Sequence, residues 1–286
     1  MSLLSLPQVI SPTWLAGRLA ESSLVILDAS WYLPVAGRDA WSEYRAGHLP
    51  GAVYIDLDAI SDPTSDLPHT LPNAMHFSRV VGGLGISNAD RLVIYDGSGN
   101  NLSAARVWWM FRGFGHTSVA LLDGGLAAWR RAGLPLESGE VDRPAGDYTA
   151  TRALAGVMNL AAVRTALATG SAQVVDLRSK GRFTGRDPEP RPGLLSGHMD
   201  GALNLPFTDL VDGDGMVLPD KVLRGRLAAA GVDLNRPVIA TCGSGTSACN
   251  LLLGLVRLGV PDAMLYDGSW TEWVTHGMPI ATGDAG

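Results

Sequence analysis

Cys242 is the residue whose setting most favours chemistry, and it is one of two cysteines in the chain of 286 residues. It follows the short apolar run 238–241, and a loop of small residues separates it from a helical pattern that begins at residue 248. A thiol between the end of a strand and the start of a helix faces backbone N–H groups and the positive end of the helix dipole, which both favour the thiolate. Because free cysteines are often buried and inert, a structural role stays open for this segment alone. Cys249 lies inside the predicted helix and is expected in the core, with a redox role as the alternative.

The pattern around Cys242 occurs twice in the chain. Segments of the first half match segments of the second half in the same order: 25–28 with 174–177, 47–52 with 197–202, 92–99 with 238–245, and 123–129 with 267–273. The chain is therefore expected to hold two copies of one fold of about 130 to 140 residues, a usual domain size. Asp96 stands in the first copy where Cys242 stands in the second, so the first copy is predicted to be inactive.

Short apolar strands alternate with helical patterns in both halves. The first half predicts strands at 24–28, 52–56, 91–95 and 119–122 and helices at 74–84, 104–114 and 126–132. The second half predicts strands at 173–177, 202–205, 237–241 and 263–266 and helices at 221–230, 248–258 and 270–275. This alternation indicates an α/β fold, with a mainly parallel sheet in each half and helices on both of its faces. The expected domains are 1–140 and 152–286, joined by a polar linker at 141–151 that contains Pro and Gly.

Composition excludes several classes of function. The net charge of -6 and the lack of a basic run argue against nucleic-acid binding, and no apolar stretch reaches the length of a membrane span. The first 17 residues contain no Lys or Arg, and two cysteines do not make a disulfide framework, so a reducing cytoplasm is expected. The spacing of the His and Cys residues fits no metal motif, and no dinucleotide or Walker sequence is complete, so neither metal nor cofactor is expected.

A cysteine-based phosphatase is a serious alternative, because it also uses a thiolate at the start of a loop. That chemistry needs an Arg in the loop to hold a phosphate dianion. The loop residues 243–248 include no basic side chain. Neutral donors around one large polarisable atom suit a thiolate or a persulfide better than a phosphate.

The tandem repeat, with Asp96 in one copy and Cys242 in the other, resembles the two-domain rhodanese superfamily of sulfurtransferases over essentially the whole chain. In that superfamily, thiosulfate sulfurtransferases carry a Cys-Arg-Lys-Gly type of loop, and the 3-mercaptopyruvate type carries Cys-Gly-Ser-Gly. Residues 242–245 are similar to the second, although Thr246-Ser247 stands where that type usually has Val-Thr. The segments 27–34, 107–112 and 181–191 resemble the same type.

The resemblance implies a reaction and residues that carry it. Cys242 would attack the sulfur of 3-mercaptopyruvate, release pyruvate and hold the sulfur as a persulfide until cyanide or a thiol, such as thioredoxin or a small thiol, accepts it. Arg182 and Arg191 match the positions that bind the substrate carboxylate in the family, and ordinary solvated arginines are the alternative. Loop N–H groups would stabilise the anionic sulfur. The loop residues expected to contact it are Gly243, Gly245, Thr246 and Ser247.

By the same resemblance, Ser244, His69 and Asp58 would form a relay that activates the thiol or protonates the enolate. His69 could instead be a surface-loop histidine, and Asp56 is an equally good candidate by sequence, without the motif. A thiosulfate sulfurtransferase stays open as the alternative enzyme. A persulfide carrier or a rhodanese-like module that docks a protein partner stays open as a non-enzyme function.

Overall fold

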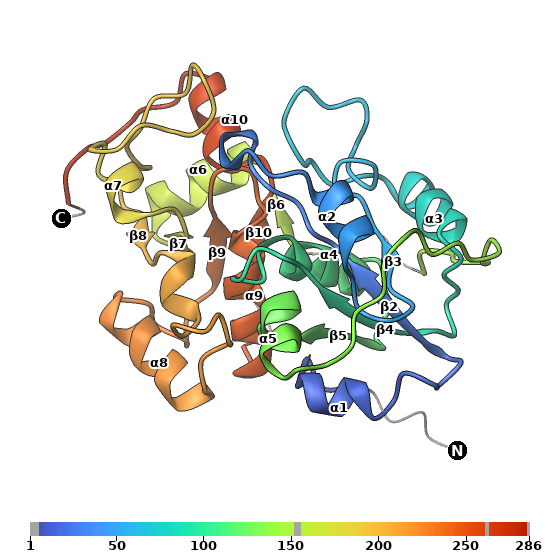
Figure 1. Ribbon diagram of the computed structural model, residues 1–286. Coiled ribbons are helices and arrows are strands. Elements are labelled where there is room, and N and C mark those ends of the chain that lie inside the picture. The colour runs from blue at the N-terminus through green and yellow to red at the C-terminus, as the bar shows by residue number, and fades with distance from the viewer. Residues whose placement is uncertain (1–5, 152–155, 261–262, 285–286) are drawn as a thin grey trace. The chain divides into compact units, whose positions relative to one another are not determined.

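The computed structural model of the chain describes residues 6–151, 156–260 and 263–284 (Figure 1). Contacts group these residues into two compact units, which are described separately. Unit 1 comprises the described residues of 1–64, 71–155 and 213–217, and unit 2 comprises those of 65–70, 156–212 and 218–286. Each unit thus takes one short segment from the other half of the sequence, which the predicted domains do not include. The predicted domain ends at residues 1, 152 and 286 lie outside the described residues, and the linker at 141–151 stays a proposal.

Unit 1 contains, within the described residues, a five-stranded sheet in the order β1-β5-β4-β2-β3, and every strand pair in it is parallel. Its strands are β1 (Val9–Ile10), β2 (Leu24–Asp28), β3 (Val53–Tyr54), β4 (Arg91–Tyr95) and β5 (Val119–Leu122). Its helices are α1 (Pro12–Ala16), α2 (Ala40–Ala46), α3 (Ala74–Gly83), α4 (Leu102–Gly113) and α5 (Gly125–Arg131), with a 3-10 turn at Pro34–Ala36.

Unit 2 repeats this topology in its own described residues, with parallel strands in the order β6-β10-β9-β7-β8. Its strands are β6 (Val157–Met158), β7 (Gln173–Asp176), β8 (Leu203–Asn204), β9 (Val238–Thr241) and β10 (Ala263–Tyr266). Its helices are α6 (Leu160–Thr169), α7 (Lys180–Phe183), α8 (Asp220–Ala229), α9 (Ala248–Arg257) and α10 (Ser269–Thr275), with a 3-10 turn at Phe207–Leu210. The predicted α/β fold with two parallel sheets is confirmed.

The central strands are buried along their whole length, which requires cover on both faces of each sheet. All five residues of β2 and all four of β9 are buried. Because successive side chains point to opposite faces, Leu24 and Ile26 join the core cluster of one face with Trp129 of α5. In unit 2, Ile239 of β9 packs on one face in the cluster that includes Trp270 of α10. Each such large apolar side chain stabilises the fold by about 1.5–3 kcal/mol when it is fully buried.

Among the described residues, no helix is long and apolar enough to cross a membrane.

Candidate active site

Cys242 directly follows β9, which lies in the middle of the unit 2 sheet between β10 and β7. Its side chain lies at the carboxyl edge of parallel strands, where α/β sheets bind their ligands, and the residue is 2% exposed. The Cys242 N–H donates to Ser269 Oγ over 3.2 Å, and its carbonyl accepts from Trp270 N over 3.0 Å. The start of α10 therefore fixes the backbone of the cysteine.

Ser269 holds this position at a conformational cost that the sequence does not reveal. It is fully buried, its φ is 52°, and its hydroxyl donates to the carbonyl of Tyr266 over 2.7 Å. The left-handed region favours glycine, and the matching residue of unit 1 is Gly125, with a φ of 53°. A serine there is strained by roughly 1–3 kcal/mol, and its hydroxyl gives the Cys242 N–H an acceptor in return.

The loop after Cys242 turns tightly into α9. Gly245 has a φ of 75°, and the N–H of Cys249 donates to the Thr246 carbonyl over 3.1 Å. In the described part of the chain, the side chain of Ser247 makes no capping hydrogen bond at the start of α9. Cys249 is fully buried with its Sγ 3.4 Å from the Gly245 carbonyl, as expected for a core residue.

Arg182 and Arg191 both reach the loop, at Gly243. A Cβ added to Gly243 would lie 3.1 Å from Arg182 Nη2 and 3.7 Å from Arg191 Nη1. Arg191 Nη2 also donates to Ser244 Oγ over 3.3 Å. Two guanidinium groups therefore face the residue next to Cys242, and a Cβ there would crowd that of Arg182.

A buried carboxylate, Glu189, holds Arg182 in this position. Arg182 Nη2 lies 2.5 Å and Nε lies 3.2 Å from Glu189 Oε2, and the Glu189 side chain is 1% exposed. Glu189 also pairs with Arg178 Nη1 over 2.8 Å. The guanidinium of Arg178 is fully buried, bonds to Asp176 and lies 4.1 Å from the ring centroid of Trp270. Burial acts to lower the pKa of Arg178, but Asp176 and Glu189 outweigh it and raise that pKa.

Sequence reasoning missed Arg178 and Glu189. Glu189 lies inside the segment 181–191 that carries the resemblance, but its part in a network with Arg182 depends on tertiary contacts.

His69 belongs to unit 2 through the short segment 65–70. The residue is 5% exposed, so it is not a surface-loop histidine. Its Nδ1 lies 3.1 Å from Ser244 Oγ and 3.2 Å from Thr246 Oγ1. The tautomer decides whether Nδ1 donates or accepts, and therefore sets the direction of its hydrogen bonds with these hydroxyls. The structure thus brings the predicted pair Ser244 and His69 together and adds Thr246.

Asp58 belongs to unit 1, where its Oδ2 accepts from Trp31 Nε1 over 3.1 Å. Asp56, the rival candidate, accepts from the N–H of Asp58 over 2.9 Å. The role of Asp58 in a relay with His69 therefore stays a prediction.

In the matching loop of unit 1, the side chain of Asp96 stands at the position of the thiol and accepts several hydrogen bonds. The carboxylate of Asp96 accepts from Ser98 N over 2.8 Å, from Ser98 Oγ over 2.6 Å and from Ala104 N over 3.0 Å. Ser103 Oγ adds a fourth donor at 3.3 Å, and Asp96 is 1% exposed. The strand-end loop of this fold can therefore hold an anion with neutral donors alone.

Within the described residues, no group of three or more His, Cys, Asp or Glu side chains could hold a metal ion.

Comparison with known proteins gives consistent matches over nearly the whole chain. The family model described as "Rhodanese-like domain" matches residues 11–132 and again residues 159–276. The chain is 45% identical over 276 residues to the 3-mercaptopyruvate sulfurtransferase of Homo sapiens, a match that covers 95% of this chain and 93% of that one. It is 42% identical over 279 residues to a thiosulfate sulfurtransferase of Mus musculus, with 95% and 93% covered.

A solved structure matches the fold as well. The crystal structure of SseA from Escherichia coli, which is described as a 3-mercaptopyruvate sulfotransferase, aligns with a TM-score of 0.85 and 38% identity. The alignment covers 93% of this chain and 99% of that chain.

Proposed function

Because the chain belongs to the rhodanese family, with one rhodanese-like domain in each half, we propose that it is a sulfurtransferase that moves sulfur from 3-mercaptopyruvate to a thiol or to cyanide. The observation that carries this proposal is the pair of guanidiniums that faces Gly243, directly beside Cys242. The 45% identity to a protein named 3-mercaptopyruvate sulfurtransferase supports the choice of donor.

The substrate would be held by its carboxylate and carbonyl oxygens. Arg182 and Arg191 supply the positive charge that the loop 243–248 lacks, and a planar guanidinium suits a carboxylate. Glu189 binds the Nε and Nη2 atoms of Arg182, but Nη2 carries a second N–H and also faces Gly243, so we assign Nη2 and Nη1 to the donor. A donor with one carboxylate fits this site better than a dianion, because Glu189 offsets part of the positive charge.

Transfer proceeds in two steps. The Cys242 thiolate attacks the sulfur of the donor and forms the S–S bond, while the C–S bond of the donor breaks and leaves its electron pair on carbon. The products are a Cys242 persulfide and the enolate of pyruvate, which takes up one proton. An acceptor thiolate then attacks the outer sulfur, leaves as a persulfide and returns Cys242 as a thiolate.

Groups near Cys242 would supply the proton that the enolate takes up and stabilise the negative charge on sulfur. The Ser244–His69 pair lies two residues from the nucleophile, and we assign it the delivery of the proton to the enolate, oriented by Asp58. Backbone N–H groups of Gly243, Gly245, Thr246 and Ser247 would stabilise the anionic sulfur. In the sister loop the Asp96 carboxylate accepts from two backbone N–H groups, those of Ser98 and Ala104, and from two hydroxyls, which supports neutral donors as partners of the anionic sulfur.

The acceptor and the compartment belong to the same proposal. Both cysteines carry free thiols, and we assign the reaction to a reducing cytoplasm, where thioredoxin or a small thiol would accept the sulfur.

The test is intact-mass measurement after incubation with 3-mercaptopyruvate and no acceptor. The wild type should gain one sulfur, and Cys242→Ser should gain none and lose turnover, because a hydroxyl does not form a stable persulfide. Cys249→Ser serves as the matched control and should still gain the sulfur. Added sulfur on Cys249, or turnover by Cys242→Ser, would overturn the assignment.

A thiosulfate sulfurtransferase is the second candidate, favoured by the 42% identity to the mouse protein of that name. A persulfide carrier, or a module that only docks a partner, would show no turnover with free 3-mercaptopyruvate.

A further inference from the structure

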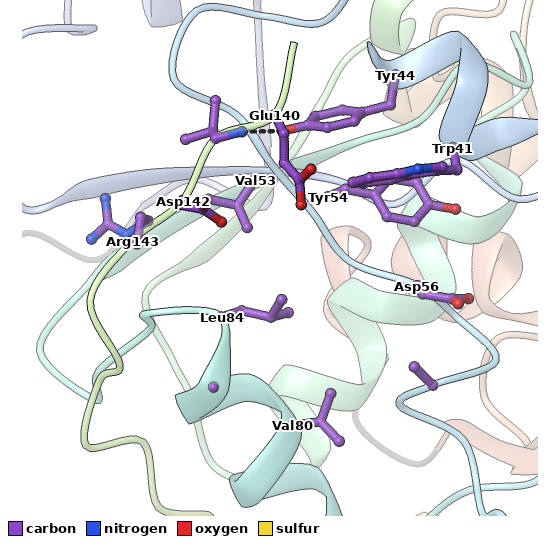
Figure 2. Close-up of a pocket in the computed structure, with 13 residues that line it drawn as sticks. Trp41, Tyr44, Val53, Tyr54, Asp56, Val80, Leu84, Glu140, Asp142 and Arg143 are labelled. Atoms are coloured by element: carbon purple, nitrogen blue, oxygen red, sulfur yellow. Dashed lines mark hydrogen bonds between the residues drawn. The ribbon is translucent and has the colours of Figure 1, made fainter.

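Unit 1 contains a groove that the proposed reaction does not use (Figure 2). It lies between the edge strand β3, the helices α2 and α3 and the segment 140–143, and its volume is about 260 Å³. We call it the β3 groove. This volume is below the roughly 300–1,000 Å³ of sites for drug-sized ligands, so the β3 groove fits a group of side-chain size.

Three aromatic rings converge on one side of the β3 groove. Trp41 and Tyr44 stack with ring centroids 5.4 Å apart, and Tyr54 meets the Trp41 ring edge-on at 5.2 Å. Figure 2 shows the rings of Trp41 and Tyr54 opposite Val80 and Leu84. The Trp41 residue is 37% exposed, so solvent reaches a ring system that attracts cations.

The charges at the β3 groove are mainly negative. Its lining includes the exposed carboxylates of Asp56, Glu140 and Asp142 and one guanidinium, that of Arg143. The Nε of Arg143 donates to the Gly85 carbonyl over 3.2 Å, and its guanidinium points away from the aromatic rings in Figure 2. The groove therefore combines a negative rim with an aromatic wall.

Unit 2 has a groove at the matching place, beside its own edge strand β8. Two structural markers fix the correspondence. Tyr44 stacks on His48 at 4.3 Å in unit 1, and Phe183 stacks on His198 at 4.0 Å in unit 2. Lys180, three residues before Phe183, therefore stands at the place of Trp41.

The carboxylates of the two grooves also correspond. The bridges of His48 with Glu137 and of His198 with Ala281 align the segments that follow, so Asp284 matches Glu140. In unit 2, Lys180 Nζ lies 3.1 Å from Asp284 Oδ1. In unit 2 the groove thus contains an ammonium group, that of Lys180, paired with its carboxylate. In unit 1 the matching residues are an aromatic ring, Trp41, and a carboxylate, Glu140.

We propose that the β3 groove binds the cationic side chain of an arginine or lysine presented by a protein partner. The cation would lie against Trp41 and pair with Glu140, as Lys180 pairs with Asp284 in the sister groove. The small volume and the exposed rim favour one side chain of a larger molecule over an enclosed small ligand.

The probe is an acetyl-Gly-Arg-Gly-amide peptide, titrated into the full chain labelled with 15N, and the readout is the indole N–H signal of Trp41. The signal should shift to saturation, and a peptide with neutral citrulline in place of arginine should not shift it. Trp41→Leu removes the ring, so its binding is followed on backbone signals of α2; it and Glu140→Gln should each weaken binding by about fivefold. Asp284→Asn, in the sister groove, is the matched control and should bind like the wild type.

Equal binding of the citrulline peptide, or unchanged affinity in both β3-groove variants, would overturn the proposal. Free agmatine that binds as tightly as the peptide would also overturn it, in favour of a small-molecule cation. Turnover of 3-mercaptopyruvate should stay at the wild-type rate in both variants, so this test is independent of the proposed reaction.

Discussion

At the scale of single residues, the site is organised around charges that the fold has already paired. Glu189 lies between two guanidiniums, and only one of them, Arg182, reaches the loop of Cys242. A buried hydrogen bond to a charged group is worth about 1.5–3 kcal/mol. Glu189 can therefore fix the direction of Arg182 more firmly than a surface ion pair could.

We expect Glu189→Gln to raise the KM for 3-mercaptopyruvate several-fold with a smaller change in kcat. The amide keeps the shape of the side chain but removes the charge that orients Arg182. The free energy of unfolding should fall by about 1–3 kcal/mol, because Arg178 loses one of its two buried carboxylate partners. Steady-state kinetics and urea denaturation give both numbers, with the exposed Asp200→Asn as control. A lower KM would show instead that Glu189 competes with the donor for Arg182.

At the scale of elements, local pattern was enough for the central strands and their helices. The predicted strands 24–28, 91–95 and 119–122 match β2, β4 and β5. Helix α2 was missed because Tyr44 is its one buried residue, which leaves no apolar periodicity to read. Helix α6 was also missed, although the sequence marks both of its ends: Asn159 accepts from Ala162 N at its start, and Gly170 follows its last residue.

The site shows the same division between local and long-range information. The nucleophile loop could be predicted from a strand, small residues and a helix in sequence order. His69 reaches Ser244 because a segment from the first half of the chain folds with unit 2, and no local pattern shows such an exchange. The left-handed backbone of Ser269 could not be predicted from its own segment either, because a serine does not indicate a positive φ. The matching Gly125 in the repeat is the one sequence signal for it.

The loop 243–245 is the element that we expect to set donor preference. The wild type should prefer 3-mercaptopyruvate over thiosulfate by at least about tenfold in kcat/KM, or roughly 1.4 kcal/mol. Gly243→Arg with Ser244→Lys should shift preference towards thiosulfate, because the added cations face its second charge.

Gly243→Ala is the control that distinguishes the effect of a larger side chain at this position from the effect of an added positive charge. A Cβ there approaches Arg182 Nη2 to 3.1 Å without adding a cation, so kcat/KM should fall for both donors and the preference should stay. If the wild type uses thiosulfate as well as or better than 3-mercaptopyruvate, the loop does not select the donor.

At the scale of the whole molecule, the two units share one topology but differ in the side chains that lie over the glycine of the strand-end loop, which is Gly97 in unit 1 and Gly243 in unit 2. Both units have the same strand order, and β2 pairs with β3 as β7 pairs with β8, through Leu27 with Val53 and Val175 with Leu203. Over Gly243 lie two arginines, whereas a Cβ at the matching Gly97 would meet Tyr32 Oη at 2.5 Å. Tyr32 thus fills in unit 1 the place that the guanidiniums occupy in unit 2.

The double variant Asp96→Cys/Cys242→Ser tests whether position alone makes a thiol active. We expect no added sulfur and no turnover with 3-mercaptopyruvate, because Tyr32 occupies the space over the first loop. Tyr32 Oη would lie 2.5 Å from a Cβ at Gly97, nearer than Arg38 Nη2 at 3.8 Å, and the Arg38 guanidinium lies over the Tyr32 ring. Cys242→Ser alone is the control, and circular dichroism checks that both variants fold. Sulfur on residue 96 after incubation with the donor would show that the two halves are chemically equivalent, and that the arginines over Gly243 are not what makes Cys242 reactive.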